Sequence, residues 1–379
     1  MLSFGKKSVA TTITTKNVPV TALPNPQPGS YARSDIRPSV KNNASEDDLK
    51  WQLISSNATE TQTFYMSLDG GNFAFVQMAY STMGLTPNIG LTCRVYQRDG
   101  TKEGKTINHG PSAFKTSDNK MSVTCEQMSI KYNPATNGYA VQFALSKETF
   151  VDVDFTPLEP AFKINDGKIL FAKTEKDGFV LTQFMPKAVI SGTVSIGGKS
   201  FEAKGQGLFH HAVLCKPQCA YKWNFINFQN EDDALMLHEF DMTQKGNFDV
   251  SIVSQGCLVR NNHSIAITTN NRAVHVQRQL DSTSGYEVPT QAFISWQGKT
   301  LEDNLDVSVE ISTLLSNKLD TIDVLAELPY LLRKFIQTFI TAPYLFSWYE
   351  KVVAKVTIGD EVSEMEGNMF MECTFLAKE

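Results

Sequence analysis

The chain has 379 residues, of which 41% are hydrophobic and 10% aromatic, and its formal net charge is −5. This apolar content is enough for packed cores and excludes a mainly disordered chain, while the length suggests two or three domains. The slightly acidic balance excludes non-specific nucleic-acid binding, because proteins of that class need a basic surface.

The first 45 residues differ from the rest. They contain five of the 15 prolines, many threonines, and six basic residues against one acidic residue. Such a segment cannot bury a core, so we expect residues 1–45 to form a mobile basic arm. Neither a secretory signal nor an apolar stretch of the roughly 20 residues that span a bilayer is recognisable. The sequence therefore predicts a cytoplasmic protein.

The start of this arm has the pattern of a short amphipathic helix. Its lysines lie on one arc of a helical wheel, and five apolar side chains lie on the other: Met1, Leu2, Phe4, Val9 and Ile13. A helix of this kind can lie on a membrane surface. The threonines that follow are poor helix formers, so a tail without regular structure is the alternative.

From residue 46 onward, apolar residues follow the two-residue period of β-strands. In residues 150–155, Val151, Val153 and Phe155 alternate with two aspartates, which is typical of a half-buried strand. Short runs of this kind, separated by Asp-Gly and Asn-Gly turns, predict an antiparallel sandwich or barrel. The pattern restarts after residues 222–223, so we expect one β unit at residues 46–213 and a second at residues 218–379.

One segment of the second unit breaks the β pattern. Between residues 320 and 350, large apolar side chains recur at helical spacing, and Pro329 and Pro343 interrupt them. This predicts two short helices or one kinked helix. We interpret the segment as a helix packed on a barrel wall. The alternatives are a lid over a ligand cavity and a face that touches a membrane.

Four residues of the types found in zinc sites lie close together: His210, His211, Cys215 and Cys219. Their spacing is not specific, and most cysteines of the chain lie among apolar neighbours, as reduced thiols do. We therefore expect no metal, no cofactor and no disulfide between Cys215 and Cys219.

The two histidines could instead be catalytic or line a cavity. A catalytic histidine needs a partner carboxylate, for which Glu239 and Asp241 are candidates. A hydrolase elbow, a phosphate loop and a dinucleotide fingerprint are all missing from the sequence. Their absence argues against a nucleotide-dependent enzyme.

Several sequence blocks resemble the fungal survival-factor family. The most specific is Trp-Asn-Phe-x-Asn-Phe-Gln, and the resemblance covers roughly residues 46 to 378. The matching blocks are residues 50–52 (Lys-Trp-Gln), 60–65 (Glu-Thr-Gln-Thr-Phe-Tyr), 71–77 (Gly-Asn-Phe-Ala-Phe-Val-Gln), 93–96 (Cys-Arg-Val-Tyr), 210–211 (His-His), 222–229 (Lys-Trp-Asn-Phe-Ile-Asn-Phe-Gln) and 323–330 (Asp-Val-Leu-Ala-Glu-Leu-Pro-Tyr).

The resemblance implies an all-β fold of two tandem antiparallel lipocalin-like β-barrels with a short C-terminal helical insertion, remotely similar to carotenoid 1,2-hydratases. It also implies non-enzymatic binding of ceramide or a related sphingolipid. Transfer between endoplasmic reticulum and Golgi would support survival under oxidative stress. The family further implies peripheral contact with these membranes through the N-terminal helix, with the nucleus as a further compartment.

A Phe-rich chain of small barrels suits a carrier of one apolar ligand. The candidate ligand-lining or interface residues are His210, His211, Trp223, Phe225 and Phe228, which we expect near the junction of the two units. No catalytic residue is assigned. Two alternatives remain: a hydratase-like enzyme on an apolar isoprenoid, with His210 or His211 as the acid, and an interaction scaffold with filled barrels.

Overall fold

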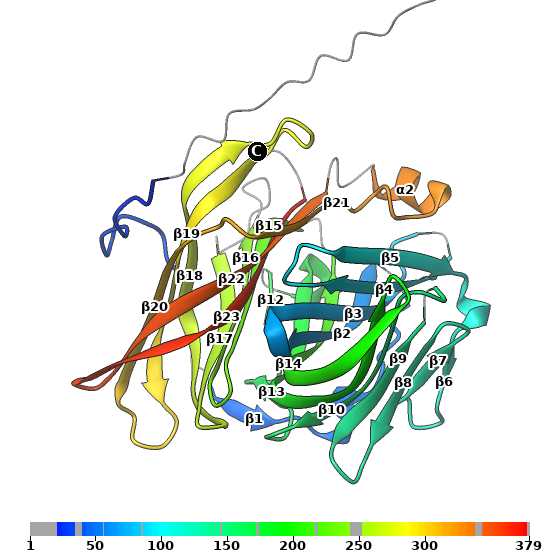
Figure 1. The fold of residues 1–379 in the computed structure, drawn as a ribbon, viewed down its shortest axis with the longest axis horizontal. Helices are drawn as coiled ribbons and strands as arrows, with labels where there is room; N and C mark the ends of the chain where they lie inside the picture. Colours follow the sequence, from blue (N-terminus) through cyan, green and yellow to red (C-terminus); the bar gives the residue numbers. More distant parts are fainter. Residues whose placement is uncertain are drawn as a thin grey trace, which may run out of the picture.

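Strands with alternating burial make up most of the structure, and they form two antiparallel sheets (Figure 1). The computed structural model describes residues 21–34, 40–55, 57–84, 86–144, 146–171, 174–216, 219–242, 252–337 and 343–376. The alternation predicted for residues 150–155 is confirmed, since Val151, Val153 and Phe155 are buried and the two aspartates are exposed.

The first sheet has 14 strands and ends at Cys215. Its main hydrogen-bonded order is β5 (Lys102–His109), β4 (Asn88–Tyr96), β3 (Asn72–Ser81), β2 (Ala58–Leu68), β14 (Lys199–Cys215), β13 (Phe179–Ile196), β10 (Phe150–Pro157), β9 (Gly138–Phe143), β8 (Met128–Asn133), β7 (Val123–Cys125) and β6 (Lys115–Thr116). Two short strands pair with β13, namely β11 (Phe162–Ile164) and β12 (Lys168–Leu170), and β1 (Lys41–Asn43) pairs with β11.

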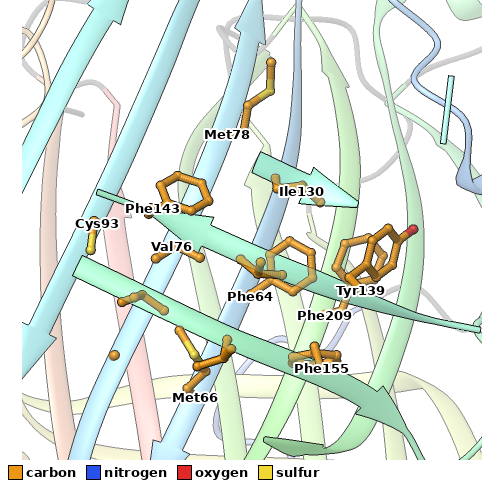
Figure 2. Close-up of a cluster of buried hydrophobic side chains, with 14 of the residues drawn as sticks. Phe64, Met66, Val76, Met78, Cys93, Ile130, Tyr139, Phe143, Phe155 and Phe209 are labelled. Atoms are coloured by element: carbon orange, nitrogen blue, oxygen red, sulfur yellow. The ribbon is translucent and has the colours of Figure 1, made fainter. Parts of the chain in front are cut away.

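This sheet curls into a half-barrel around a packed apolar core (Figure 2). At the centre of the core, the Phe64 ring lies 5.4 Å from the rings of both Tyr139 and Phe155. Successive strand residues point to opposite faces, so Phe64 and Met66 enter the core while Tyr65 belongs to the outer face. Side chains therefore fill the inside of the half-barrel.

The second sheet closes into an eight-stranded barrel, because β20 pairs with β22 as well as with β19. Its order is β20 (Asp306–Leu314), β19 (Glu287–Thr300), β18 (His263–Leu280), β17 (Ile252–Arg260), β16 (Ala234–Met242), β15 (Ala220–Gln229), β23 (Glu361–Phe375) and β22 (Tyr344–Ile358), with β21 (Lys318–Asp323) added beside β22. Buried Phe228, Trp296 and Trp348 fill its interior. The predicted all-β fold is confirmed.

The helical insertion is shorter than the sequence indicated. Only α2 (Tyr330–Ile336) is helical in the described part of residues 320–350, and the two ends of that range belong to β21 and β22. The reason is that Phe346 and Trp348 also fit a two-residue period, which lets both fill the barrel interior. The other helical elements that lie wholly within the described residues are α1 (Glu46–Leu49) and three single 3-10 turns, η1 (Asp69–Gly71), η2 (Pro111–Ala113) and η3 (Glu175–Asp177).

Residues 21–34, part of the segment expected to form a mobile arm, lie along the outside of the barrel. The Leu23 amide donates a hydrogen bond of 2.7 Å to Gln291, the Ser34 hydroxyl donates one of 2.5 Å to the Thr269 carbonyl, and the Tyr31 ring lies 6.0 Å from that of Phe293. The chain then continues to β1 in the first sheet. Residues 21–34 therefore contact the second sheet and residues 41–43 pair with the first, through contacts that need no core of their own.

The two sheets meet through their outer faces, where aromatic side chains interlock. Phe73 of β3 stacks on Phe370 of β23 at 4.6 Å, and Tyr65 of β2 stacks on Phe225 of β15 at 4.8 Å. Phe73 and Phe370 are almost completely buried. This aromatic contact holds the half-barrel against the barrel beside the candidate site.

Candidate functional site

A pocket of about 360 Å³ lies between the outer faces of the two sheets. Strands β2 to β5 and β14 line one side, and β15, β16, β22 and β23 line the other. The segment from β21 to α2 contributes Ile322, Leu325, Leu328 and Leu332 to the lining. The volume falls in the usual range for pockets that bind small molecules.

One part of the pocket wall is apolar. Met83, Val180, Phe240, Leu325 and Leu332 belong to a single buried cluster and also line the pocket. Another part carries hydroxyl groups on alternate residues of β2, because Thr59, Thr61 and Thr63 share one strand face. The wall therefore offers both a surface for alkyl groups and a surface for hydrogen bonds.

His210 of β14 lies within a stack of rings at the polar side of the pocket. Its ring is nearly parallel to Phe184 at 4.9 Å and to Phe225 at 5.7 Å. His238 of β16 meets it edge-on at 5.0 Å, with an interplanar angle of 90°. The two histidines thus come from different sheets and face one another across the junction.

Both histidines are buried and uncharged. His210 is 5% exposed and His238 9% exposed, and no described residue hydrogen-bonds either imidazole. Burial lowers the pKa of His238 to about 3, and burial together with the neighbouring histidines holds the pKa of His210 well below its usual range. Each ring therefore keeps one donor and one acceptor nitrogen at neutral pH.

A buried carboxyl group lies beside this pair. On neighbouring strands, Glu372 is paired with Phe225, which is paired with His238, so the three share one face of the barrel. Trp223 and Thr374 each donate a hydrogen bond of 3.0 Å to Oε1 of Glu372. Burial raises the pKa of Glu372, and these hydrogen bonds only partly oppose the shift.

Ion pairs fasten the segment between β21 and α2 over the pocket. Arg94 of β4 pairs with Asp320 at 3.2 Å and also with Glu327. Glu327 accepts a second hydrogen bond from the Thr106 hydroxyl at 2.8 Å, and its backbone carbonyl accepts one from Asn108 at 2.6 Å. The half-barrel thereby holds a segment of the second unit across the junction.

Of the five candidate residues, His210, Trp223 and Phe225 line the pocket, whereas His211 and Phe228 do not. His211 points into the half-barrel, where its Nε2 lies 2.8 Å from Glu60 Oε1, and Phe228 lies in the barrel core. The expectation that all five lie at the junction is therefore wrong for these two. Strand alternation explains it, because neighbouring residues such as 210 and 211 face opposite sides.

The carboxylates considered as histidine partners lie elsewhere. Glu239 and Asp241 pair with Arg272 at 2.6 and 3.0 Å, and Lys222 binds Asp241 at 2.9 Å. Sequence reasoning did not assign Arg94, His238 or Glu372 to the site. In the sequence, the sign of such a role is that His238 and Phe240 share one strand face. Whether these side chains reach the pocket depends on the register of the neighbouring strands.

Cys215 is the last residue of β14 in the first sheet, and Cys219 directly precedes β15 of the second sheet. Cys215 and Cys219 are half-buried free thiols, and Cys219 donates a hydrogen bond to the Asp177 carbonyl. Within the described residues, no group of three His, Cys, Asp or Glu side chains converges as metal ligands.

The apolar residues Met1, Leu2, Phe4, Val9 and Ile13 lie outside the described residues. None of the described helices has the length and hydropathy to cross a membrane.

Comparison with known sequences gives consistent matches. The model of the Svf1 family matches residues 11–377. The ceramide-binding protein svf1 of Emericella nidulans is 29% identical over 361 residues, covering 93% of this chain and 94% of that protein. The ceramide-binding protein svf1 of Schizosaccharomyces pombe is 26% identical over 340 residues, covering 87% and 89%.

Solved structures share the fold at low sequence identity. A putative AttH from Nitrosomonas europaea superposes with a TM-score of 0.59 at 12% identity, covering 95% of this chain and 99% of that chain. Kievitone hydratase from Nectria haematococca superposes with a TM-score of 0.56 at 10% identity, covering 88% and 94%. These similarities concern the fold alone.

Proposed function

Because this chain belongs to the Svf1 family, we propose that it binds ceramide without converting it and carries it between membranes. The names of its relatives as ceramide-binding proteins support the ligand. The observation that carries the proposal is the pocket between the two sheets, where an apolar wall lies beside unpartnered histidines. Side chains fill the cores of the half-barrel and of the barrel, so the junction is the better ligand site.

The chemistry of ceramide matches this pocket. Ceramide has two long alkyl chains and a small head with one amide and hydroxyl groups. Leu325, Leu328 and Leu332 would contact the chains, where burial of each methylene contributes about 0.8 kcal/mol. His210, His238 and the β2 threonines would contact the head.

Lipid extraction from the purified full-length protein tests the proposal. Mass spectrometry should detect bound ceramide, and added ceramide should bind with saturation. Ala79→Trp should abolish binding, because Ala79 lines the pocket. Ala140→Trp is the matched control on β9, away from the pocket. Purified protein that neither retains nor takes up ceramide would contradict the proposal.

We also propose where the protein transfers ceramide. We expect ceramide to move between endoplasmic reticulum and Golgi and thereby to support survival under oxidative stress, as the resemblance implies. Cells that carry the Ala79→Trp variant should deliver labelled ceramide to the Golgi more slowly and should tolerate peroxide less well. Normal delivery in these cells would contradict the transfer role.

A hydratase-like enzyme is the second candidate. The observation that favours it is Glu372, a buried acid that borders the pocket and whose raised pKa favours the protonated form. Such an acid can protonate a carbon–carbon double bond while a neutral histidine accepts a proton from the attacking water. An isoprenoid that gains the mass of one water with this protein, but not with Glu372→Gln, would establish this candidate over the carrier.

A further inference from the structure

The pocket lining has few side chains that normally carry a charge, and those are already engaged. Arg94 is the one basic side chain other than histidine among the lining residues that the structure describes. It is only 7% exposed and contacts both Asp320 and Glu327. Glu327 in turn is bound by Arg94 and Thr106. Lys102 also lies 3.5 Å from Asp320, so the cluster has two basic and two acidic groups and no net charge to offer a ligand.

The second acidic group of the lining, Glu372, is engaged at one of its two oxygens. Oε1 of Glu372 accepts hydrogen bonds from Trp223 and Thr374, both at 3.0 Å. The side chain is buried between β15 and β23, and no described basic residue forms an ion pair with it. An ammonium group would have to lose its water shell to reach this buried carboxyl group.

The two histidines are the polar groups without partners. A buried ring nitrogen of each, Nε2 of His210 and Nδ1 of His238, has no hydrogen-bond partner within the described structure. Both rings line the pocket, but these two nitrogens have almost no accessible surface, so a ligand would reach the other nitrogen of each ring, Nδ1 of His210 and Nε2 of His238. Buried polar groups in native proteins are nearly always hydrogen-bonded, so two histidine rings without partners at a pocket point to a ligand. A neutral imidazole offers one donor and one acceptor, as amides and hydroxyls also do.

We infer that His210 and His238 bind the polar head of the lipid and that the pocket selects uncharged lipids. This selectivity rests on the proposed function, because it presupposes that ceramide binds in the pocket and adds that charged lipids bind there less well. A phosphorylated lipid is rejected because Arg94 is already neutralised by two carboxylates. A sphingoid base is disfavoured because Glu372, the lining carboxyl group without an ion-pair partner among the described residues, is buried and already accepts hydrogen bonds from Trp223 and Thr374. Ceramide is accepted because its head is uncharged and forms hydrogen bonds.

Replacing each histidine by phenylalanine separates binding from stability. His210→Phe and His238→Phe keep a ring in place and remove the unpartnered nitrogens, so the thermal midpoint should stay constant or rise. Ceramide affinity should fall about three- to tenfold for each, the effect of one neutral hydrogen bond. His238→Gln, which can still form hydrogen bonds, should recover part of the affinity.

The control is His263→Phe, because this histidine side chain is 77% exposed and lies outside the pocket. It should leave affinity unchanged. Unchanged ceramide affinity in both His210→Phe and His238→Phe would overturn the inference while leaving the carrier function intact. A wild-type protein that binds no ceramide would instead overturn the proposed function.

A ligand panel on the unmodified full-length protein tests selectivity without any variant. Ceramide, ceramide 1-phosphate and sphingosine of matched chain length should compete for the site in a displacement assay. We expect the two charged lipids to bind at least about tenfold more weakly than ceramide, since each leaves a charge unpaired. Equal affinity for ceramide 1-phosphate or for sphingosine would overturn the proposed selectivity.

Discussion

At the scale of single residues, burial decides what the histidines can do. His210 and His211 are adjacent in sequence, yet one lines the pocket and the other pairs with Glu60 inside the half-barrel. His210 and His238 stay neutral because burial disfavours the charged form. A neutral imidazole suits a hydrogen-bonding role, and the same burial makes stability depend on pH.

The His238→Phe variant should lose less stability than wild type when the pH is lowered. The pKa of His238 is about 3 in the folded protein, against an ordinary 6.5. Below pH 6.5 the unfolded chain therefore binds a proton that the folded chain does not, and acid favours unfolding. Urea denaturation at pH 7, 6 and 5 should show that the variant loses about 1.4 kcal/mol less per pH unit in the acid part of this range.

The neighbouring titratable groups do not change this sign. His210 faces His238 and shifts in the same direction, while Glu372 has a raised pKa and loses stability as pH rises. Both are present in wild type and variant, but His238 also lowers the pKa of His210, so the difference contains the effect of His238 itself and a smaller effect on His210. Parallel stability curves for the two proteins would show that His238 already titrates normally in the folded state.

At the scale of elements, the segment between β21 and α2 connects the two units at the pocket. The sequence predicted a helix here, with a lid over a ligand cavity as one alternative. Leu325, Leu328 and Leu332 line the pocket, and Glu327 is bound by Arg94, Thr106 and Asn108 of the half-barrel. The segment is therefore placed to control access to the pocket.

Glu327→Ala should loosen this segment without unfolding the protein. The change removes an ion pair and a hydrogen bond from a partly buried carboxylate, so we expect a loss of about 1–2 kcal/mol. Amide hydrogen exchange should accelerate in residues 324–329, and bound ceramide should dissociate faster. Glu302→Ala, in an exposed turn, is the control. Unaltered exchange in residues 324–329 would contradict the role of Glu327.

The N-terminal residues remain the proposed membrane contact. Five apolar side chains on one face would each contribute at most about 1–2 kcal/mol, against an ordering cost of about 1 kcal/mol per residue. Each nearby lysine adds about 1 kcal/mol on anionic membranes. The balance predicts weak, salt-sensitive binding.

Flotation with anionic liposomes measures this contact. Deleting residues 2–13, or replacing Phe4 by Asp, should leave the protein in the soluble fraction with both sheets folded. Lys6→Glu should also reduce binding, by reversing one attractive charge. If the deleted and Phe4→Asp proteins float as well as wild type, the anchor lies elsewhere, and the segment around α2 becomes the leading candidate.

At the scale of the whole molecule, further contacts join the half-barrel to the barrel. The outer faces share a buried aromatic cluster that includes Tyr65, Phe73, Phe225 and Phe370. Residues 21–34 contact the barrel, and residues 41–43 pair with β11 of the first sheet. The division into an arm and two units at residues 46–213 and 218–379 stays a prediction, and the shared cluster favours joint unfolding.

Phe73→Ala should destabilise the whole molecule. Phe73 is fully buried and stacks on Phe370 at 4.6 Å, so its truncation should cost about 3–5 kcal/mol. Thermal unfolding should remain a single transition at lower temperature. A double-mutant cycle with Phe370→Ala should show a coupling of about 0.5–1.5 kcal/mol. Two separate transitions in wild type would instead establish independent units.

The sequence by itself determined the strands and the family. Two-residue alternation such as Val151, Val153 and Phe155 is local, so it could be identified without a structure. The Trp-Asn-Phe-x-Asn-Phe-Gln block identified the family for the same reason, because it is contiguous in the chain. Alternation also placed Trp223 and Phe225 on one strand face, and both line the pocket.

Only the tertiary structure decided where the pocket lies and which residues line it. Arg94, His210, His238 and Glu372 are far apart in sequence and meet because strand register and the packing of two outer faces bring them together. The same cause separates His210 from His211. Strand alternation places neighbouring residues on opposite faces of a sheet. Which face is buried in a core and which lies at the junction depends on how the partner sheet packs.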